Sequence, residues 1–227
     1  MQQRTEAATL ATGLDARITD ARPAYAKFIA WVVLEAHRSH LERGLWDLLA
    51  AGPEQQTLHF LEALALSDEP HAAHYSTFLI ASIEGRPAAA LSGYFYDEFG
   101  TAGLAAALPW AARAAGMAHR ELAEGWRRAA SIARCAPAHA PGAWVIENVA
   151  TLPQFRRRGL AGRLLAEILE RGRARGATVA DAAVLIGNAP AQRMYERAGF
   201  RVAGEQRHPD FEAAYGSPGV RTLARTL

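Results

Sequence analysis

The segment from Val149 to Ala161, which reads VATLPQFRRRGLA, constrains the fold more than any other part of this sequence. A strand-like run passes through a basic turn containing Gly159 and continues directly into an amphipathic helix. Gly159 and Ala161 are small enough to let a ligand approach the backbone, and the following helix presents its positive dipole end at the same place. The segment therefore predicts a phosphate-binding turn between a strand and a helix.

Three consecutive arginines, Arg156, Arg157 and Arg158, precede the glycine of this turn. An isolated run of arginines is usually a solvated helix entry. Their position before a Gly-x-Ala helix start favours phosphate binding instead. We expect most contacts to come from main-chain N–H groups between Arg157 and Ala161, including that of Leu160.

A second segment, Asn188 to Phe200, reads NAPAQRMYERAGF. It resembles the Asn-x-x-Ala-x-x-x-Tyr-x-x-x-Gly-Phe block of the GNAT-type N-acetyltransferases, and Arg156-x-x-Gly159-x-Ala161 is similar to the acetyl-CoA pyrophosphate loop of that family. Two matched motifs in the expected order make the resemblance specific. The close resemblance covers roughly the last third of the chain.

The resemblance implies an α/β fold with a mixed, mainly antiparallel twisted sheet. Its central strand pair should be parallel and splayed, and helices should flank the sheet. We expect residues 1–14 to form a flexible tail and residues 15–227 to form the acetyltransferase domain. An alanine-rich helical insertion at about 100–142 has no clear counterpart in the family, and Pro109 and Gly116 should interrupt it.

Hydrophobic spacing predicts a short strand at Arg17–Asp20, one long helix over Tyr25–Leu49 and another helix over Glu54–Leu66. A helix should follow the phosphate turn, and a short one should begin at Asn188. The remaining strands are predicted at Ser76–Glu84, Pro87–Tyr96, Trp144–Ala150, Thr178–Ile186, Phe200–Gly204 and Val220–Arg225.

Tyr195 lies on an apolar stripe of its predicted helix, so it suits core packing. The resemblance adds a position beside the CoA sulfur, where a phenol with an ordinary pKa near 10 could protonate the leaving thiolate. Asn188 could serve only as a helix N-cap, or it could also contact the pantetheine arm. Main-chain groups of Val149, Ala150 and Thr151 should pair with pantetheine like an added strand.

Glu147 is a carboxylate in an otherwise apolar run just before the cofactor turn. If it faces the cleft, it could accept the proton of an ammonium substrate, and otherwise it is a solvent-facing strand residue. Asp97 and Glu98 are weaker candidates for the same role or for binding a cationic acceptor. Trp110 and Trp126 suggest an aromatic acceptor wall, a packed helical pair or a dimer surface.

Composition narrows the function classes. The 227 residues are 50% hydrophobic and carry a net charge of only +2, so the chain lacks the basic field of a nucleic-acid binder. Cys135 is the only cysteine, no Cys/His cluster has metal-ligand spacing, and His71 with His74 suggests a solvated pair. No secretory signal or membrane span is recognised, which favours a cytoplasmic protein.

These observations predict an acetyl-CoA-dependent N-acetyltransferase that binds no metal. The amine of a small molecule or peptide should attack the thioester directly in a ternary complex, without a covalent enzyme intermediate. A noncatalytic acyl-CoA-binding or sensing module is the alternative, because a fold and a cofactor motif do not prove turnover. The acceptor cannot be read from the sequence, and a homodimer is compatible with it.

Overall fold

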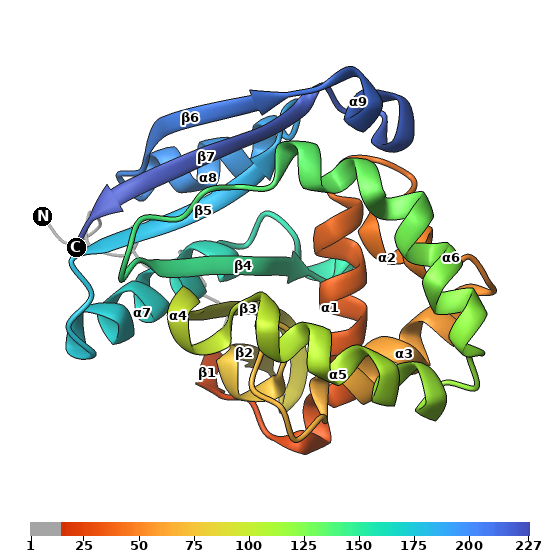
Figure 1. The fold of residues 1–227 in the computed structure, drawn as a ribbon. Helices are drawn as coiled ribbons and strands as arrows, with labels where there is room; N and C mark the ends of the chain where they lie inside the picture. The colour runs from red at the N-terminus through yellow and green to blue at the C-terminus, as the bar shows by residue number, and fades with distance from the viewer. Residues whose placement is uncertain (1–14) are drawn as a thin grey trace, which may run out of the picture.

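The protein contains a sheet of seven strands in the order β1-β2-β3-β4-β5-β7-β6 (Figure 1). The structure is a computed structural model that describes residues 15–227, so the tail predicted at 1–14 lies outside the described residues. The strands are β1 (Ala16–Asp20), β2 (Phe78–Ile83), β3 (Arg86–Phe95), β4 (Trp144–Thr151), β5 (Val179–Leu185), β6 (Arg201–Arg207) and β7 (Gly219–Thr226).

Neighbouring strands pair antiparallel throughout, except for the central β4 and β5, which are parallel. Their register covers only Trp144 to Ile146 against Ala180 to Ala182. Both strands continue beyond these pairs, β4 as far as Thr151 and β5 as far as Leu185. The two strands therefore diverge toward their carboxyl ends, which confirms the predicted splayed parallel pair.

Helices cover both faces of this sheet (Figure 1). The α-helices are α1 (Ala26–Arg38), α2 (Leu45–Leu49), α3 (Glu54–Ala65), α4 (Tyr96–Phe99), α5 (Thr101–Ala114), α6 (His119–Ala129), α7 (Leu160–Ala174), α8 (Ala189–Arg197) and α9 (Pro209–Tyr215). Short 3-10 helices are η1 (Pro23–Tyr25), η2 (Tyr75–Thr77), η3 (Ala130–Cys135) and η4 (Pro153–Phe155).

The two larger of three hydrophobic cores among residues 15–227 lie on opposite faces of the sheet. Phe78 and Ile80 of β2 pack with residues of α1, α3, α5 and α6, whereas Leu79 between them packs with residues of α7 and α8. Alternate residues of one strand thus serve opposite faces, as a pleated strand requires. The same alternation in β4 places Ile146 on the α7 face and Glu147 on the α1 face.

The helices between β3 and β4 are docked on the protein rather than extended from it. In Figure 1 the chain from α4 to α6 forms an arc around α1, with α5 in front of its lower part and α6 beside it. A side chain at Gly103 would collide with the carbonyl oxygen of Pro70, and one at Gly125 would collide with that of Leu49. Arg128 donates hydrogen bonds to main-chain oxygens of α2 at 2.9 and 3.3 Å. The insertion therefore packs in a fixed position over the face of the sheet that α1 covers.

The single long helix predicted over Tyr25–Leu49 is wrong. The chain turns sharply after α1, where Ser39 has a φ of 60°. Gly44 then passes against the backbone of His37, where a side chain would not fit. The Gly44 N–H donates to Asp47 Oδ2 at 2.8 Å and starts α2. Close backbone approach, which hydrophobic spacing does not report, therefore splits the helix.

Pro109 does not interrupt its helix, contrary to the prediction, but lies inside α5. A proline in a helix interior costs about 3 kcal/mol, and the burial of Leu108 and Ala111 on the same helix offsets this. Gly116, with a φ of 69°, does end the helix as predicted.

No helix was predicted from the sequence at the position of α9. Of the helices in residues 15–227, none combines the length and apolar character needed to cross a bilayer.

Candidate active site

The predicted phosphate turn lies between the carboxyl end of β4 and the first turn of α7. Gly159 is the N-cap of α7 and has a φ of 78°, and Arg157 also has a positive φ, of 61°. Space is open around Gly159, since no atom lies within 4 Å of where a Cβ would be. The first N–H groups of a helix have no partner within the helix. These groups and the helix dipole can therefore receive a phosphate.

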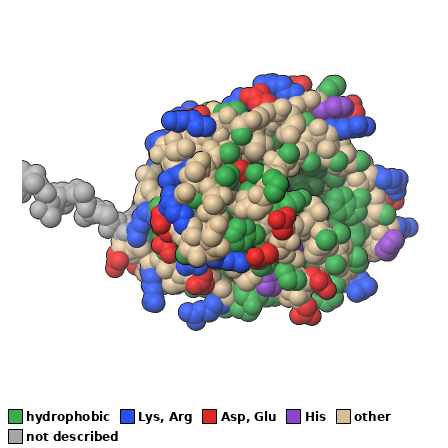
Figure 2. All heavy atoms as spheres, turned by 60° about the vertical axis from the view of Figure 1, so that its left-hand side comes forward, with side chains coloured by type: hydrophobic (Ala, Val, Ile, Leu, Met, Phe, Trp, Pro, Cys, Tyr) green, Lys and Arg blue, Asp and Glu red, His purple; other side chains and the backbone are tan. Residues whose placement is uncertain are grey.

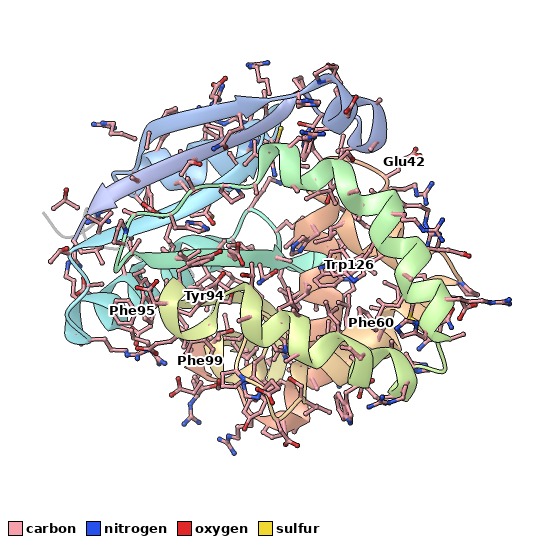
Figure 3. All side chains as sticks on the ribbon, in the orientation of Figure 1. Glu42, Phe60, Tyr94, Phe95, Phe99 and Trp126 are labelled. Atoms are coloured by element: carbon pink, nitrogen blue, oxygen red, sulfur yellow. The ribbon has the colours of Figure 1, made fainter. Side chains whose placement is uncertain are left out.

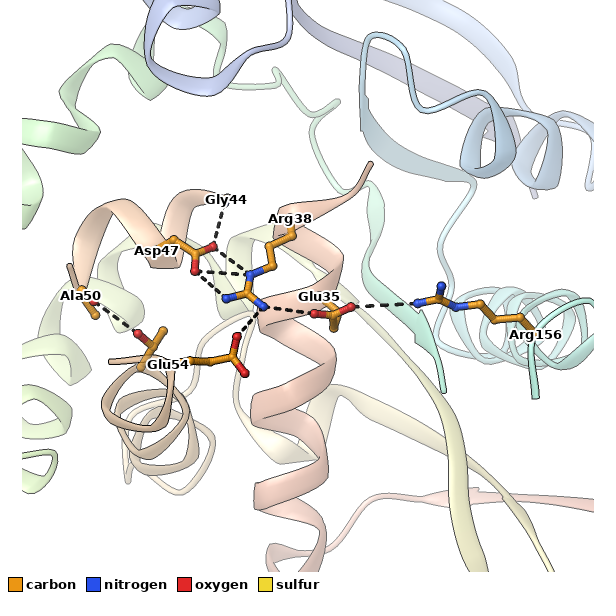
Figure 4. Close-up of polar contacts among 8 residues, drawn as sticks. Glu35, Arg38, Gly44, Asp47, Ala50, Glu54 and Arg156 are labelled. Atoms are coloured by element: carbon orange, nitrogen blue, oxygen red, sulfur yellow. Dashed lines mark hydrogen bonds and ion pairs between the residues drawn. The ribbon is translucent and has the colours of Figure 1, made fainter. Parts of the chain in front are cut away.

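The side chains of Arg156, Arg157 and Arg158 are exposed around this turn. Arg158 lies over the ring of Phe155, 5.7 Å from its centroid. The Arg156 guanidinium lies 4.0 Å from the carboxylate of Glu35 on α1 (Figure 4). The arginines are thus held loosely at the surface, where they can add positive charge to the N–H groups of the turn.

The last residues of β4 point main-chain groups toward β5 that are not paired with β3. Leu152 N–H donates to Ala88 O at 2.9 Å, so Leu152 and, by alternation, Ala150 pair with β3. The N–H and C=O of Thr151 between them point the other way, into the divergence of β4 and β5. Arg156 Nε donates to this Thr151 oxygen at 3.2 Å. The strand edge can therefore pair with an extended ligand.

A bulge distorts β4 at Asn148, immediately before Val149. Asn148 has a φ of 51°, and the β3–β4 register shifts between Ala90 and Ser92. Its Nδ2 donates to Ser92 Oγ at 3.1 Å, and its side chain is buried. The bulge redirects main-chain groups next to Val149 toward the divergence. Sequence analysis missed Asn148, although asparagine tolerates a positive φ better than most residues.

Tyr195 lies on α8 and is 3% exposed. Its ring meets that of Phe200 edge to face at 5.3 Å, within the core that α7 and α8 cover. Asn188 caps α8 as predicted, since its Oδ1 accepts from Ala191 N–H at 3.1 Å. Its Nδ2 donates to Ser39 Oγ at 2.6 Å, which joins α8 to the segment between α1 and α2.

Glu147 faces the opposite side of the sheet from Tyr195. Tyr94 of β3 donates its hydroxyl proton to Glu147 Oε2 at 2.7 Å. His37, on α1, is also close enough to sense the charge of Glu147. Sequence analysis missed Tyr94 and His37, because both come from elements far from Glu147 in the chain.

Burial and the charge of Glu147 set the protonation of its neighbours. Burial raises the pKa of Tyr195, and the negative charge of Glu147 raises it further. The same two causes hold the pKa of Tyr94 well above its usual value, with the hydrogen bond to Glu147 adding to them. Burial lowers the pKa of His37. Both phenols are therefore proton donors at neutral pH, and His37 is neutral.

The predicted acceptor residues are distributed over the insertion. Trp126 is 44% exposed on α6, and Trp110 is 43% exposed on α5. Trp126 lies on the inner side of the arc in Figure 3, and Figure 2 shows a hollow lined by hydrophobic side chains. Asp97 is exposed on α4. Glu98 forms an ion pair with Arg175 at 2.8 Å on the α7 side, so the structure does not bring Glu98 to Glu147.

The sequence predicted that His71 and His74 form a solvated pair. This prediction is wrong for His71, which is fully buried. His71 Nδ1 accepts from Ala73 N–H at 3.1 Å, and burial lowers its pKa to about 4.

Cys135 is buried, and burial is the main cause that raises the pKa of its thiol. In the part of the chain that the structure describes, no group of three His, Cys, Asp or Glu side chains could hold a metal ion.

The sequence profile of the acetyltransferase (GNAT) family matches residues 43–200. An N-acetyltransferase from Staphylococcus aureus Mu50 has a similar structure, with a TM-score of 0.63, 20% identity and coverage of 92% of this chain and 100% of that chain. A polyamine N-acetyltransferase from Drosophila melanogaster gives a TM-score of 0.54 at 19% identity, covering 94% of this chain and 100% of the other.

A GCN5-related N-acetyltransferase from Kribbella flavida gives a TM-score of 0.54 at 14% identity, with 93% and 98% of the two chains covered. These identities are low, so the structural similarities establish the fold alone. A comparison with curated protein sequences gives no match. The family profile covers more than half of the chain, including both the phosphate turn and Tyr195, and the chain therefore belongs to the acetyltransferase (GNAT) family.

Proposed function

We propose that this protein is an acetyl-CoA-dependent N-acetyltransferase that acts on the amine of a small molecule or peptide. One observation carries the proposal: Tyr195 and Glu147 lie on opposite faces of the sheet at the place where β4 and β5 diverge. They are close enough for the charge of Glu147 to raise the pKa of Tyr195. A proton donor and a proton acceptor thus flank the only parallel strand pair among the described strands.

The residues present fit coenzyme A. Its diphosphate suits the turn from Arg156 to Ala161, where helix N–H groups and arginines converge. Its pantetheine amides suit the main-chain groups of Val149 and Thr151, which face away from β3. When bound, acetyl-CoA supplies the acetyl group as a thioester. Asn188 holds the start of α8 in place beside it.

The chain's own groups would then move two protons. Glu147 takes a proton from the attacking nitrogen, directly or through a water molecule, as the new C–N bond forms. Tyr195 gives its phenolic proton to the sulfur as the C–S bond breaks. Main-chain N–H groups near Val149 polarise the carbonyl. Positioning contributes most of the rate, and no covalent enzyme intermediate is required.

The acceptor would approach from the α1 face, because Glu147 points there and the insertion covers that face. Trp126 and Trp110 are the exposed aromatic side chains of the insertion and favour an acceptor with an apolar or aromatic part. Asp97, which is exposed on α4, would attract a cationic acceptor. A role for the insertion in homodimer contacts is the alternative.

A panel of amines and peptides with acetyl-CoA, assayed by release of free thiol, tests this function. Transfer to at least one amine is expected, with slow thioester hydrolysis in its absence. A protein that binds acetyl-CoA but releases no thiol with any acceptor, or without one, would be a noncatalytic acyl-CoA-binding or sensing module.

A further inference from the structure

Tyr94 makes a close contact with the proposed base that the mechanism above leaves unused. Its hydroxyl lies 2.7 Å from Glu147 Oε2, at the upper end of the range of about 2.5–2.7 Å for a hydroxyl that donates to an ionised oxygen. Its side chain is 2% exposed. Tyr94 therefore has its partner fixed by the surrounding core rather than by solvent.

The register of the sheet explains why this contact forms. Tyr94 lies opposite Val145, and Ser92 lies opposite Glu147. Tyr94 and Glu147 are thus diagonal neighbours on one face, a separation that an aromatic side chain can bridge. A side chain at Gly93 would collide with Ile168 of α7, so Tyr94, the next residue, faces α1. The phenol reaches along β4 toward the bulge at Asn148.

The contact makes the two oxygens of Glu147 unequal. Within residues 15–227, Tyr94 is the only hydrogen-bond partner of Glu147, and it binds Oε2 alone. Oε1 remains available to another donor. A carboxylate with one oxygen held and the other open has a defined orientation, which a proton acceptor in a reaction requires.

We propose that Tyr94 is a positioning residue for acetyl transfer: it holds Oε2 of Glu147 so that Oε1 receives the proton of the acceptor amine. The N–H bond of the amine breaks and an O–H bond forms at Oε1, while the Tyr94 proton stays in place. The inference rests on the proposed role of Glu147.

Two other titratable groups are affected by the charge of Glu147. His37 comes from α1, and its Nδ1 donates to Val33 O at 3.0 Å, which leaves Nε2 without a proton in the neutral ring. Tyr195 comes from α8, on the opposite face of the sheet. Since His37 comes from the helix on the same face as Glu147, any effect of Tyr94 through Glu147 must be assigned by substitution of Glu147 itself.

The test measures kcat and the KM of the acceptor at neutral pH for the wild type and for Tyr94→Phe, with chemistry limiting the rate. Tyr94→Phe keeps the ring and deletes the donor. We expect kcat to fall about tenfold, from the loss of the hydrogen bond that orients Glu147, and the KM of the acceptor to change less than about twofold. The Kd for acetyl-CoA should change less than about twofold.

Tyr215→Phe is the matched control, because this half-buried tyrosine packs on Phe211 and bonds the backbone of Leu45. It should leave kcat and KM unchanged. Glu147→Gln should lower kcat, and Tyr94→Phe should then cause no further loss of rate. Glu147→Asp, which is too short to keep the contact, should lower kcat as Tyr94→Phe does and replaces that variant if it fails to fold.

A wild-type kcat in Tyr94→Phe, with Glu147→Gln impaired, would overturn the inference and leave the function intact. An equal loss from Tyr94→Phe in the presence and absence of the Glu147 carboxylate would do the same. If Glu147→Gln retains the wild-type rate, the proposed base is wrong, and the proposed role of Tyr94 is wrong as well.

Discussion

The cofactor half and the acceptor half of the proposed site are built in different ways. The cofactor half uses one continuous segment, from Val149 to Ala161, and relies on main-chain groups and a helix N-terminus. The acceptor half instead collects the side chains of His37, Tyr94 and Trp126 from separate elements. A main-chain site tolerates many side chains but depends on glycine geometry, whereas a side-chain site depends on how distant elements pack.

The largest effect is expected at Gly159, because the cofactor half depends on the backbone geometry of this residue. Gly159→Glu should lower acetyl-CoA affinity at least about 100-fold, because it puts an anion where the diphosphate must meet the helix N-terminus. Isothermal calorimetry measures the affinity. Wild-type protein should gain about 2.7 kcal/mol of stability at a ligand concentration 100 times its Kd, and the variant should gain at most about 0.4 kcal/mol at the same concentration.

Gly159→Ala is the control, because it has the same strained φ of 78° without the charge. It should lower stability by about 1 kcal/mol and retain most of the affinity. If a folded Gly159→Glu protein binds acetyl-CoA normally, the phosphates bind elsewhere, and the segment from Val149 to Ala161 is not the cofactor half of the site.

The next effect concerns Tyr195 on α8, the proposed proton donor to the sulfur. Tyr195→Phe keeps the buried ring that packs on Phe200 and deletes the proton that could reach the leaving sulfur. General-acid catalysis contributes about 10²- to 10⁴-fold, so turnover should fall at least about tenfold even with partial rescue by water. Stability and acetyl-CoA affinity should hold. Wild-type turnover, with chemistry limiting the rate, would make Tyr195 a core residue only.

Trp126→Ala tests whether the insertion belongs to the acceptor half. Loss of an exposed indole from an acceptor wall should raise the acceptor KM about five- to tenfold and leave the Kd for acetyl-CoA unchanged. Trp110→Ala, which removes an equally exposed indole from the same insertion, serves for comparison and should have a smaller effect. Loss of an oligomer with normal kinetics would instead assign the insertion to subunit contacts.

The smallest effect is expected at Asn188, which joins the two halves through Ser39. Asn188→Ala should lower the free energy of unfolding by about 1 kcal/mol, since it removes the N-cap of α8. Asn188→Asp keeps the cap oxygen and loses the donor to Ser39, so chemical denaturation should show a smaller loss. A larger loss of acetyl-CoA affinity in Asn188→Ala than in Asn188→Asp would indicate a contact with pantetheine.

Much of the fold followed from the sequence because its signals are local. The turn at Gly159, the cap at Asn188 and the strand and helix between them are each specified by a few consecutive residues. The prediction failed where distant backbone segments meet. Gly44 lies against the backbone of His37 and ends the helix predicted to continue there, and no hydrophobic spacing encodes that approach.

The sequence by itself determined the family and the strand-turn-helix at Gly159, and it predicted the roles of that turn and of Tyr195, because each depends on residue types at fixed spacing along one stretch of chain. Only the tertiary structure decided that Tyr94 donates a hydrogen bond to Glu147 and that Asn148 forms the bulge. Those contacts arise from the register of β3 against β4, with the paired residues more than 50 positions apart in the sequence. Register is set by the packing of whole strands and helices, so no local pattern reports it.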